Sequence, residues 1–336
     1  MYERICIVNA GGWGTALAVL LAGKGYPVTL WARRPELAEA IALTRENPDY
    51  LPGVRIPDLV YPTSSLEEAV DGASVVLVPA ISRFMREIAE RLRPLVCADQ
   101  LVVSCSKGLD LDSLQRCTEL LEDALGDAHR GRVAAISGPN HAEEVSRGIP
   151  TATVVACRDK GVGLQLQSLL STRSFRVYTN PDVVGVELCG AVKNVVALAA
   201  GMSDGLGYGD NAKAALMTRS LAEIGRLVAE LGGEPSTVAG LAGIGDLIAT
   251  CTSRHSRNRA AGEAIARGRK LEEILGGSRM VVEGIPAAQA VMKLARLKGV
   301  EMPIARQVHA VLFEDVSPQE GLARLMGREF TSEPWM

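Results

Sequence analysis

Lys193 lies in an apolar segment with a helical pattern, Leu188–Ala200, and Asn194 follows it directly. Lysine is seldom buried without a functional reason, and burial lowers the pKa of its ammonium group toward neutrality. A lysine with such a pKa can give a proton to a substrate oxygen or remove one. Lys193 is therefore a candidate for acid–base catalysis. The local pattern alone favours the alternative, a lysine whose stem covers apolar surface while its charge reaches water.

Asp246 follows the glycine-rich triplet Gly243-Ile244-Gly245. Such a tight turn can bring a carboxylate close to another element of the fold. The alternative is that Asp246 caps the helix predicted over Leu247–Cys251, which is a common use of aspartate. Asp246 could both contact another element and cap the helix only if each of its two carboxylate oxygens served one of these uses.

Lys107 follows the predicted strand Leu101–Ser104. Ligands of open parallel sheets bind beyond the carboxyl ends of the strands, so Lys107 is placed to reach one. The alternative is a lysine in a surface turn before Gly108. No histidine is a conspicuous acid or base, because His129, His141, His255 and His309 are isolated.

The segment Thr252–Arg259 carries three arginines among hydroxyl and amide side chains. Guanidinium groups form forked, charge-assisted hydrogen bonds with phosphate, to which Ser256 and Asn258 can add neutral donors. We predict that Arg257 binds a phosphate, and that Arg254 and Arg259 lie on the solvated start of a helix. The alternative is that the whole segment is solvated.

A strand, a glycine-rich turn and a helix are predicted near the N-terminus, where the turn reads Asn9-Ala10-Gly11-Gly12-Trp13-Gly14. Its spacing is that of the dinucleotide-binding fingerprint G-x-G-x-x-G, with Asn9 in place of the first glycine. Asparagine tolerates the left-handed conformation that this position needs. An ordinary glycine-rich turn is the alternative.

The second predicted strand, Val28–Trp31, ends at Arg33 and Arg34 without the acidic residue that usually binds the ribose hydroxyls of NAD. This pair favours NADP or dual use of both cofactors. A solvated pair of arginines is the alternative, and the nearby Glu36 leaves the choice open.

Short apolar segments of strand type recur in the first half of the chain, with helical patterns between most of them. They are Arg4–Val8, Val28–Trp31, Ser74–Val78, Leu101–Ser104, Val133–Ile136, Ala152–Ala156 and Phe175–Tyr178. Long helical patterns take over after Asn180. This order predicts a Rossmann-type, doubly wound and mostly parallel sheet over 1–180. An all-helical substrate domain is predicted over 181–336.

Composition excludes several classes of protein. The net charge of −3 argues against a general nucleic-acid binder, and 4% aromatic residues argue against base-stacking surfaces. The seven cysteines show no paired spacing, which favours reduced thiols in the cytoplasm over disulfides or zinc. Neither a signal peptide nor a membrane span is expected.

Several blocks of the sequence together resemble the bacterial NAD(P)-dependent glycerol-3-phosphate dehydrogenases. They are Gly11–Ala18, Ser106–Leu109, Ser137–Val145, Lys193-Asn194, Gly243–Leu247, Ser256–Arg259 and Val282–Gly284. Asn9 and Asn140-His141 depart from the family pattern, which has Gly and more often Ser-Phe there. The resemblance implies hydride transfer between NAD(P)H and dihydroxyacetone phosphate, which supplies sn-glycerol 3-phosphate for glycerophospholipids. It also implies a homodimer.

The resemblance further implies roles for single residues. It makes Lys193 the acid of ketone reduction, Asp246 the acid that positions it, and Lys107 a third catalytic group that contacts substrate and cofactor. The implied substrate contacts are Lys107, Gly138, Asn140, Lys193, Asp246, Ser256, Arg257 and Asn258. The implied cofactor contacts are Gly11, Gly12, Trp13, Gly14, Arg33, Arg34, Lys107, Ala142, Arg257, Val281 and Glu283. Asn140 is also a candidate cap for a helix beginning at His141, and Glu283 a candidate cap or solvated acid.

Two other functions remain open at this stage. One is a two-domain dehydrogenase of a small hydroxy acid, of the hydroxyisobutyrate or ketopantoate type. The other is a dinucleotide-binding redox sensor without catalysis, which would need the turn at Asn9 but not Lys193 and Asp246 together.

Overall fold

The computed structural model describes residues 4–276, 282–329 and 332–333. The chain divides into two units. Unit 1 comprises Met1–Ser106 and Cys117–Val183, and unit 2 comprises Lys107–Arg116 and Val184–Met336. The chain therefore enters unit 2 for ten residues, returns to unit 1, and enters unit 2 again at Val184.

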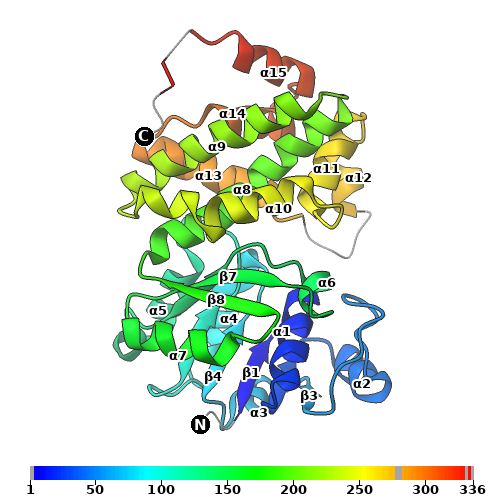
Figure 1. The fold of residues 1–336 in the computed structure, drawn as a ribbon, viewed down its shortest axis with the longest axis vertical. Helices are drawn as coiled ribbons and strands as arrows, with labels where there is room; N and C mark the ends of the chain where they lie inside the picture. The colour runs from blue at the N-terminus through cyan, green and yellow to red at the C-terminus, as the bar shows by residue number, and fades with distance from the viewer. Residues whose placement is uncertain (1–3, 277–281, 330–331, 334–336) are drawn as a thin grey trace. The chain divides into compact units, whose positions relative to one another are not determined.

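An eight-stranded sheet with the order β3-β2-β1-β4-β5-β6-β7-β8 forms the centre of unit 1 (Figure 1). Its strands are β1 Ile5–Val8, β2 Val28–Trp31, β3 Val60–Thr63, β4 Val75–Val78, β5 Leu101–Ser104, β6 Ala134–Ser137, β7 Thr151–Ala156 and β8 Phe175–Asn180. All neighbouring strands are parallel except β6 and β7. The predicted doubly wound, mostly parallel sheet is confirmed.

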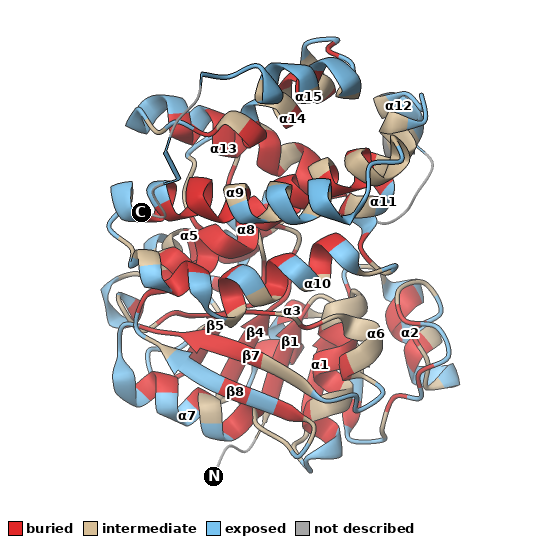
Figure 2. Ribbon diagram, turned by 45° about the horizontal axis from the view of Figure 1, so that its top comes forward, coloured by how far each residue is buried: buried red, intermediate tan, exposed pale blue. Residues whose placement is uncertain are grey.

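Helices cover both faces of this sheet, because alternate residues of each strand point to opposite sides. Ile5 and Ile7 of β1 pack in one core with the helices α1, α2 and α7, whereas Cys6 and Val8 pack in the other with α3, α4 and α5. Figure 2 shows the central strands buried. The helices are α1 Gly12–Gly23, α2 Pro35–Thr44, α3 Leu66–Val70, α4 Met85–Leu92, α5 Cys117–Leu125, α6 Ala142–Val145 and α7 Lys160–Leu170.

Apart from the excursion Lys107–Arg116, the described part of unit 2 consists of helices and the loops between them, and the predicted helical second half is confirmed. Its helices are α8 Val183–Gly205, α9 Asp210–Glu230, α10 Asp246–Thr252, α11 Arg257–Ala266, α12 Leu271–Gly276, α13 Gly284–Lys298, α14 Pro303–Phe313 and α15 Pro318–Met326. The helix α8 is long and apolar enough to cross a membrane, but 89% of its most apolar window is buried within the protein. That burial is typical of a core helix (Figure 2).

Among the described elements, β3 and α15 were not predicted from the sequence patterns. The strand β3 contains Pro62, which argues against a central strand, but β3 lies at the sheet edge, where a missing backbone donor is tolerated. The helix α15 is short, and its N-cap is the side chain of Ser317, which accepts a hydrogen bond from the backbone N–H of Glu320.

Asn9 has the conformation that its place in the turn demands, with a φ of 109°. Its side-chain amide donates to the carbonyl of Pro79 at 3.0 Å, so it joins the ends of β1 and β4, the two strands at which the strand order reverses. Gly14 is required beside it, because a Cβ atom there would lie 2.0 Å from the Asn9 carbonyl oxygen. The turn keeps the close helix–strand packing of the fingerprint although its first residue is not glycine.

Replacing Asn9 by alanine should lower the free energy of unfolding by about 1–2 kcal/mol, because the hydrogen bond to Pro79 is lost and alanine adopts a positive φ less readily than asparagine. Glycine loses the same bond but removes a conformational cost of order 1–3 kcal/mol. Asn9→Gly should therefore melt at a higher temperature than Asn9→Ala when unfolding is followed by circular dichroism. Equal melting temperatures would show that the positive φ carries no cost.

Candidate functional site

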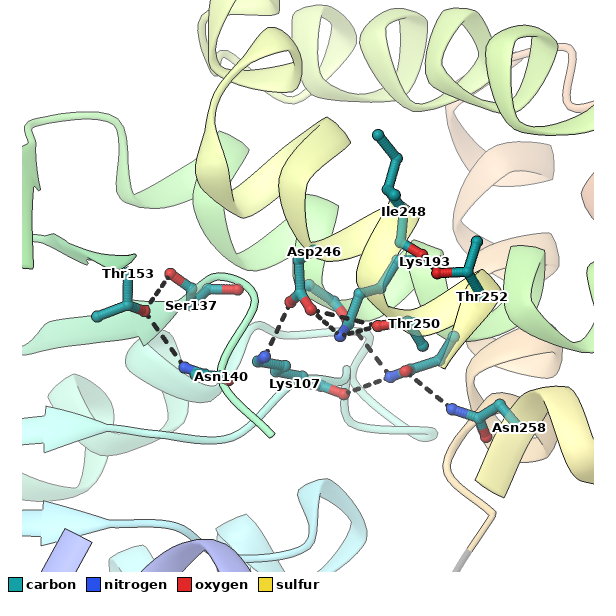
Figure 3. Close-up of polar contacts among 12 residues, drawn as sticks. Lys107, Ser137, Asn140, Thr153, Lys193, Asp246, Ile248, Thr250, Thr252 and Asn258 are labelled. Atoms are coloured by element: carbon teal, nitrogen blue, oxygen red, sulfur yellow. Dashed lines mark hydrogen bonds and ion pairs between the residues drawn. The ribbon is translucent and has the colours of Figure 1, made fainter. Parts of the chain in front are cut away.

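Lys193 is buried in unit 2, with 5% of its surface exposed, so it does not extend to water. Its ammonium nitrogen lies 2.5 Å from Oδ1 of Asp246 and 2.8 Å from the hydroxyl of Thr250 (Figure 3). Its apolar neighbours on α8, such as Val192 and Val196, lie in the core of unit 2. The alternative of a lysine that reaches the surface is wrong.

Asp246 is the first residue of α10, and its side chain does not cap that helix. Its second oxygen, Oδ2, accepts from the ammonium group of Lys107 at 2.8 Å, so one carboxylate binds two lysines (Figure 3). The preceding π-helical turn, Leu241–Gly245, needs a glycine at 243, where a Cβ atom would lie 2.0 Å from the carbonyl oxygen of Val238. The glycine-rich turn thus brings the carboxylate to α8, as its sequence indicated.

The two buried groups have shifted pKa values. Burial lowers the pKa of Lys193 to about 8; the carboxylate of Asp246 opposes this shift, and the Lys107 cation adds to it. Burial alone would raise the pKa of Asp246, but the cations of Lys107 and Lys193 outweigh it and hold that pKa below its usual 3.8. A lysine that titrates near neutral pH beside an ionised acid is equipped for proton transfer.

A chain of amide hydrogen bonds fixes the backbone around these side chains. The Asn194 amide donates to the carbonyl of Lys107 at 3.1 Å and accepts from the Asn258 amide at 2.9 Å. The side-chain oxygen of Asn258 in turn accepts from the backbone N–H of Gly284 at 2.9 Å. Four segments of unit 2 therefore meet at two asparagines, and Asn258 holds Asn194 in addition to any contact it makes with a ligand.

Glycines let α8 and α11 approach closely enough for this chain to form. A Cβ atom on Gly262 would lie 2.0 Å from the carbonyl oxygen of Leu198, and one on Gly201 would lie 1.9 Å from that of Arg259. Neither backbone oxygen can move aside without separating the helices. Because Asn258 is on α11 and Asn194 is on α8, the hydrogen bond between them depends on this close approach.

The predicted phosphate segment begins α11. Ser256 is the N-cap, and its oxygen accepts from the backbone N–H of Arg259. Arg257 is the first helical residue and is exposed. A helix N-terminus with an arginine and a serine hydroxyl suits a phosphate group. Arg259 is not part of a solvated helix start, because its guanidinium forms a partly buried ion pair with Asp204 at 2.8 Å; that prediction is wrong.

The glycine-rich turn in unit 1 fits a bound dinucleotide. Gly11 is the N-cap of α1 and offers no side chain, so the first backbone N–H groups of the helix remain available to an anion. The indole N–H of Trp13 is buried and has no hydrogen-bond partner among the described residues. A Cβ atom on Gly12 would lie 2.9 Å from the carbonyl oxygen of Tyr50 and 3.9 Å from Ala142. The predicted contact Ala142 thus lies beside the turn.

A pocket of unit 1 adjoins this turn and is lined in part by Asn9, Arg33, Arg34, Tyr50 and Phe84. The Arg33 guanidinium lies 5.6 Å from the ring centre of Phe84, and Arg34 forms an ion pair with Asp49. Glu36 is exposed and does not line the pocket. Arg91 and Glu87 also line the pocket, and Arg33 and Arg34 lie after β2, where NAD-specific sites usually present an acid.

Two further predicted residues lie after β6 in unit 1. Gly138 has a φ of 144°, and a Cβ atom there would lie 2.8 Å from the hydroxyl of Thr153. The Asn140 amide donates to that same hydroxyl at 3.2 Å (Figure 3). The expectation that Asn140 caps α6 is wrong, because His141 is the N-cap residue and no side-chain cap is formed.

The last predicted cofactor segment is described in part. Val281 lies outside the described residues. Glu283 occupies the N-cap position of α13, but its side chain forms no capping hydrogen bond with that helix.

Thr250 and Tyr50 are among the described residues in or beside these sites that sequence reasoning missed. Thr250, one helical turn after Asp246, hydrogen-bonds both to Asp246 and to Lys193, and the i,i+4 spacing on α10 was a usable signal. Tyr50 lines the pocket that contains Arg33 and Arg34, and nothing in its sequence surroundings indicates a site residue.

A doubly wound sheet with a dinucleotide-type turn, joined to a helical unit that carries a buried lysine and aspartate, is typical of dinucleotide-dependent dehydrogenases. Sequence profiles described as the N-terminus and the C-terminus of NAD-dependent glycerol-3-phosphate dehydrogenase match residues 4–162 and 182–323. The chain belongs to the NAD-dependent glycerol-3-phosphate dehydrogenase family.

Individual relatives agree over nearly the whole chain. The glycerol-3-phosphate dehydrogenase [NAD(P)+] of Chlorobium limicola is 50% identical over 97% of this chain and 98% of its own length. That of Moorella thermoacetica is 50% identical over 99% and 98%. The crystal structure of glycerol-3-phosphate dehydrogenase from Coxiella burnetii superimposes with a TM-score of 0.92 at 39% identity, over 97% of this chain and 99% of that one.

Gly262→Ala should destabilise the protein, because separating α8 from α11 costs about 1–3 kcal/mol or more, which exceeds the gain of about 1 kcal/mol from replacing a helical glycine. Gly225→Ala in α9 is the matched control, since its Cβ atom would meet no atom within 4 Å. The control should be as stable as the parent protein or more so in urea unfolding. Equal effects of the two substitutions would contradict the close approach of α8 and α11.

Proposed function

We propose that this protein interconverts dihydroxyacetone phosphate and sn-glycerol 3-phosphate with NAD(P)H, and so supplies the backbone of glycerophospholipids. The observation that carries the proposal is the pair of lysines bound to the buried carboxylate of Asp246. Its support is membership of a family whose relatives carry this activity in their names. When bound, the reduced nicotinamide supplies the hydride to the central carbon of the substrate.

The chain's own residues supply the proton and the charge balance. Lys193 gives a proton from Nζ to the ketone oxygen as the carbon–oxygen double bond becomes a single bond, and it takes that proton back in the reverse reaction. Asp246 orients the ammonium group and Thr250 adds a second acceptor for it. Lys107 contributes a second cation that polarises the carbonyl group and contacts both substrate and nicotinamide.

Three residues at the start of α11 are proposed to bind the phosphate. Arg257 supplies a guanidinium group, Ser256 a hydroxyl and Asn258 the second N–H of its amide, while the helix N-terminus adds its positive end. Gly138 and Asn140 complete the proposed substrate contacts through a backbone group and an amide.

The cofactor is proposed to bind with its pyrophosphate at the turn formed by Gly11, Gly12, Trp13 and Gly14. Arg33 and Arg34 favour NADP, or use of both cofactors, because either guanidinium can bind a 2′-phosphate. Lys107, Ala142, Arg257, Val281 and Glu283 are the remaining proposed cofactor contacts. We propose further that unit 1 supplies the main contacts of the cofactor, and that unit 2 supplies the acid–base groups and the phosphate contacts.

The protein is also proposed to be a cytoplasmic homodimer. Sedimentation equilibrium would measure its oligomeric state.

The pH dependence of kcat/KM should report the titration of Lys193. Reduction needs its ammonium form, so kcat/KM for dihydroxyacetone phosphate should fall as the pH rises through about 8. Oxidation needs the neutral amine, so kcat/KM for sn-glycerol 3-phosphate should rise through the same pH and then level. Lys193→Ala should lower both by about 10²–10⁴-fold, and an intact rate in that variant would refute the assignment.

Lys107→Met provides the matched test, because the Lys107 cation helps to lower the pKa of Lys193. Its removal should move the midpoint of the reduction profile to higher pH. An unchanged midpoint would show that the two lysines do not interact in the working enzyme.

A steady-state assay should compare NADH with NADPH, and dihydroxyacetone phosphate with 2-oxo acids. Arg33→Ala and Arg34→Ala should each raise the KM for NADPH by about 10–100-fold, the loss of one or two charge-assisted hydrogen bonds, and change the KM for NADH little. Equal effects on both cofactors would argue against a 2′-phosphate site, and faster turnover of a 2-oxo acid would argue against the proposed substrate.

A further inference from the structure

The excursion Lys107–Arg116 is a short hairpin that belongs to unit 2 although it follows β5 of unit 1. Leu109 and Arg116 face each other in an antiparallel bridge, and the backbone N–H of Asp110 donates to the carbonyl of Gln115 at 3.0 Å. Leu109 is buried in the apolar core around α8. Lys107 is therefore carried by the hairpin and not by the sheet.

A buried ion pair fixes the far end of this hairpin. Nη1 of Arg116 lies 2.8 Å from Oε2 of Glu187, and the two side chains are only 8% and 3% exposed. Glu187 is on α8, the helix that carries Lys193. Burying two charges removes their hydration, so such a pair adds little stability compared with apolar residues of the same size, and its best-attested use is to fix one arrangement of the chain.

The near end of the hairpin is held by the same helix. The Asn194 amide donates to the carbonyl of Lys107 at 3.1 Å, and the Lys107 ammonium reaches Asp246 at 2.8 Å. Contacts with α8 thus hold both ends of the hairpin: Glu187 holds Arg116, and Asn194 holds Lys107. With the Glu187 contact removed, the hairpin would keep the Asn194 bond, the packing of Leu109 and the hydrogen bond from Lys293 to the Leu111 carbonyl, but it would lose its buried ion pair with α8.

We propose that Arg116 and Glu187 are positioning residues for the reaction: their ion pair fixes the hairpin on α8 and so holds the Lys107 ammonium group on Asp246. The inference rests on the proposed function for its catalytic meaning. Errors of about 1 Å in the position of a reacting group can cost about 10²-fold in rate, so a pair outside the substrate site can control turnover.

The test compares the double variant Arg116→Met/Glu187→Met with the parent protein. Replacing both residues avoids leaving either member of the pair buried without the other, so the double variant should lose less melting temperature than either single variant. Its kcat/KM for dihydroxyacetone phosphate should nonetheless fall about 10–100-fold. The pH midpoint of that profile should move upward, because the Lys107 cation no longer lies beside Lys193.

A pair with merely structural importance would not move the pH midpoint, so an unchanged midpoint with unchanged kcat/KM would overturn the proposal. Arg116→Lys retains a cation for Glu187 and should recover most of kcat/KM and the original midpoint. The exposed pair Arg324–Glu320 on α15, changed to methionines in the same way, is the control and should leave both quantities unchanged. Should the double variant fail to fold, Glu187→Gln, which keeps the side-chain shape, takes its place.

A readout without turnover separates this inference from the proposed function. Reductive methylation of the protein, followed by mass spectrometry of its peptides, measures how accessible each lysine amine is. Lys107 should react several-fold faster in the double variant, while the exposed Lys298 should be unchanged. An unaltered Lys107 rate would overturn the positioning role. If Lys107 is labelled faster in the double variant, and the parent protein does not turn over dihydroxyacetone phosphate, the positioning role is retained and the proposed function is rejected.

Discussion

Asp246 is a single carboxylate, almost fully buried, with one lysine on each of its oxygens. Three charged groups in so little water are stable only because each has a partner at hydrogen-bond distance, and removing one partner of a buried pair typically costs about 3–5 kcal/mol. This requirement reaches into the fold. The turn Leu241–Gly245 must be narrow enough to aim the acid, α8 must present Lys193, and the hairpin must deliver Lys107.

The two lysines on this carboxylate differ in burial, because the side chain of Lys107 is 16% exposed and that of Lys193 is 6% exposed. Lys193 is enclosed by apolar side chains of α8, and its pKa falls to about 8. Lys107 reaches Asp246 from the hairpin, and its side chain is partly exposed to solvent. The arrangement leaves one amine able to exchange a proton near neutral pH while the other serves as a neighbouring cation. Around the three charged groups, Asn194 and Asn258 fix the backbone through uncharged hydrogen bonds. Gly201 and Gly262 let α8 and α11 approach closely enough for the bond between the two asparagines to form.

Much of this could be predicted from the sequence, and the residues show where prediction stops. Short apolar segments identified most strands, because a parallel sheet covered on both faces is buried throughout, and helical periodicity identified the long helices. Pro62 concealed β3, since the pattern could not tell an edge from a centre. Lys193 and Asp246 were marked separately by an apolar surrounding and a glycine turn. Their contact joins positions 53 residues apart, which no local pattern specifies. For Arg259 and Asn140 the helix-end chemistry suggested solvent and a cap, and tertiary partners prevailed instead.

The excursion Lys107–Arg116 also bears on how the protein is made. A ribosome releases these ten residues well before α8, to which they bind, so the hairpin must wait for more than sixty further residues before its ion pair and its apolar contact exist. The chain must lose the entropy of closing that loop before the contact can stabilise it, so docking of the hairpin on α8 comes late in folding. Cutting the gene at Val183 would therefore yield no self-sufficient catalytic domain, since the second fragment would lack Lys107 and would bury Glu187 without its arginine.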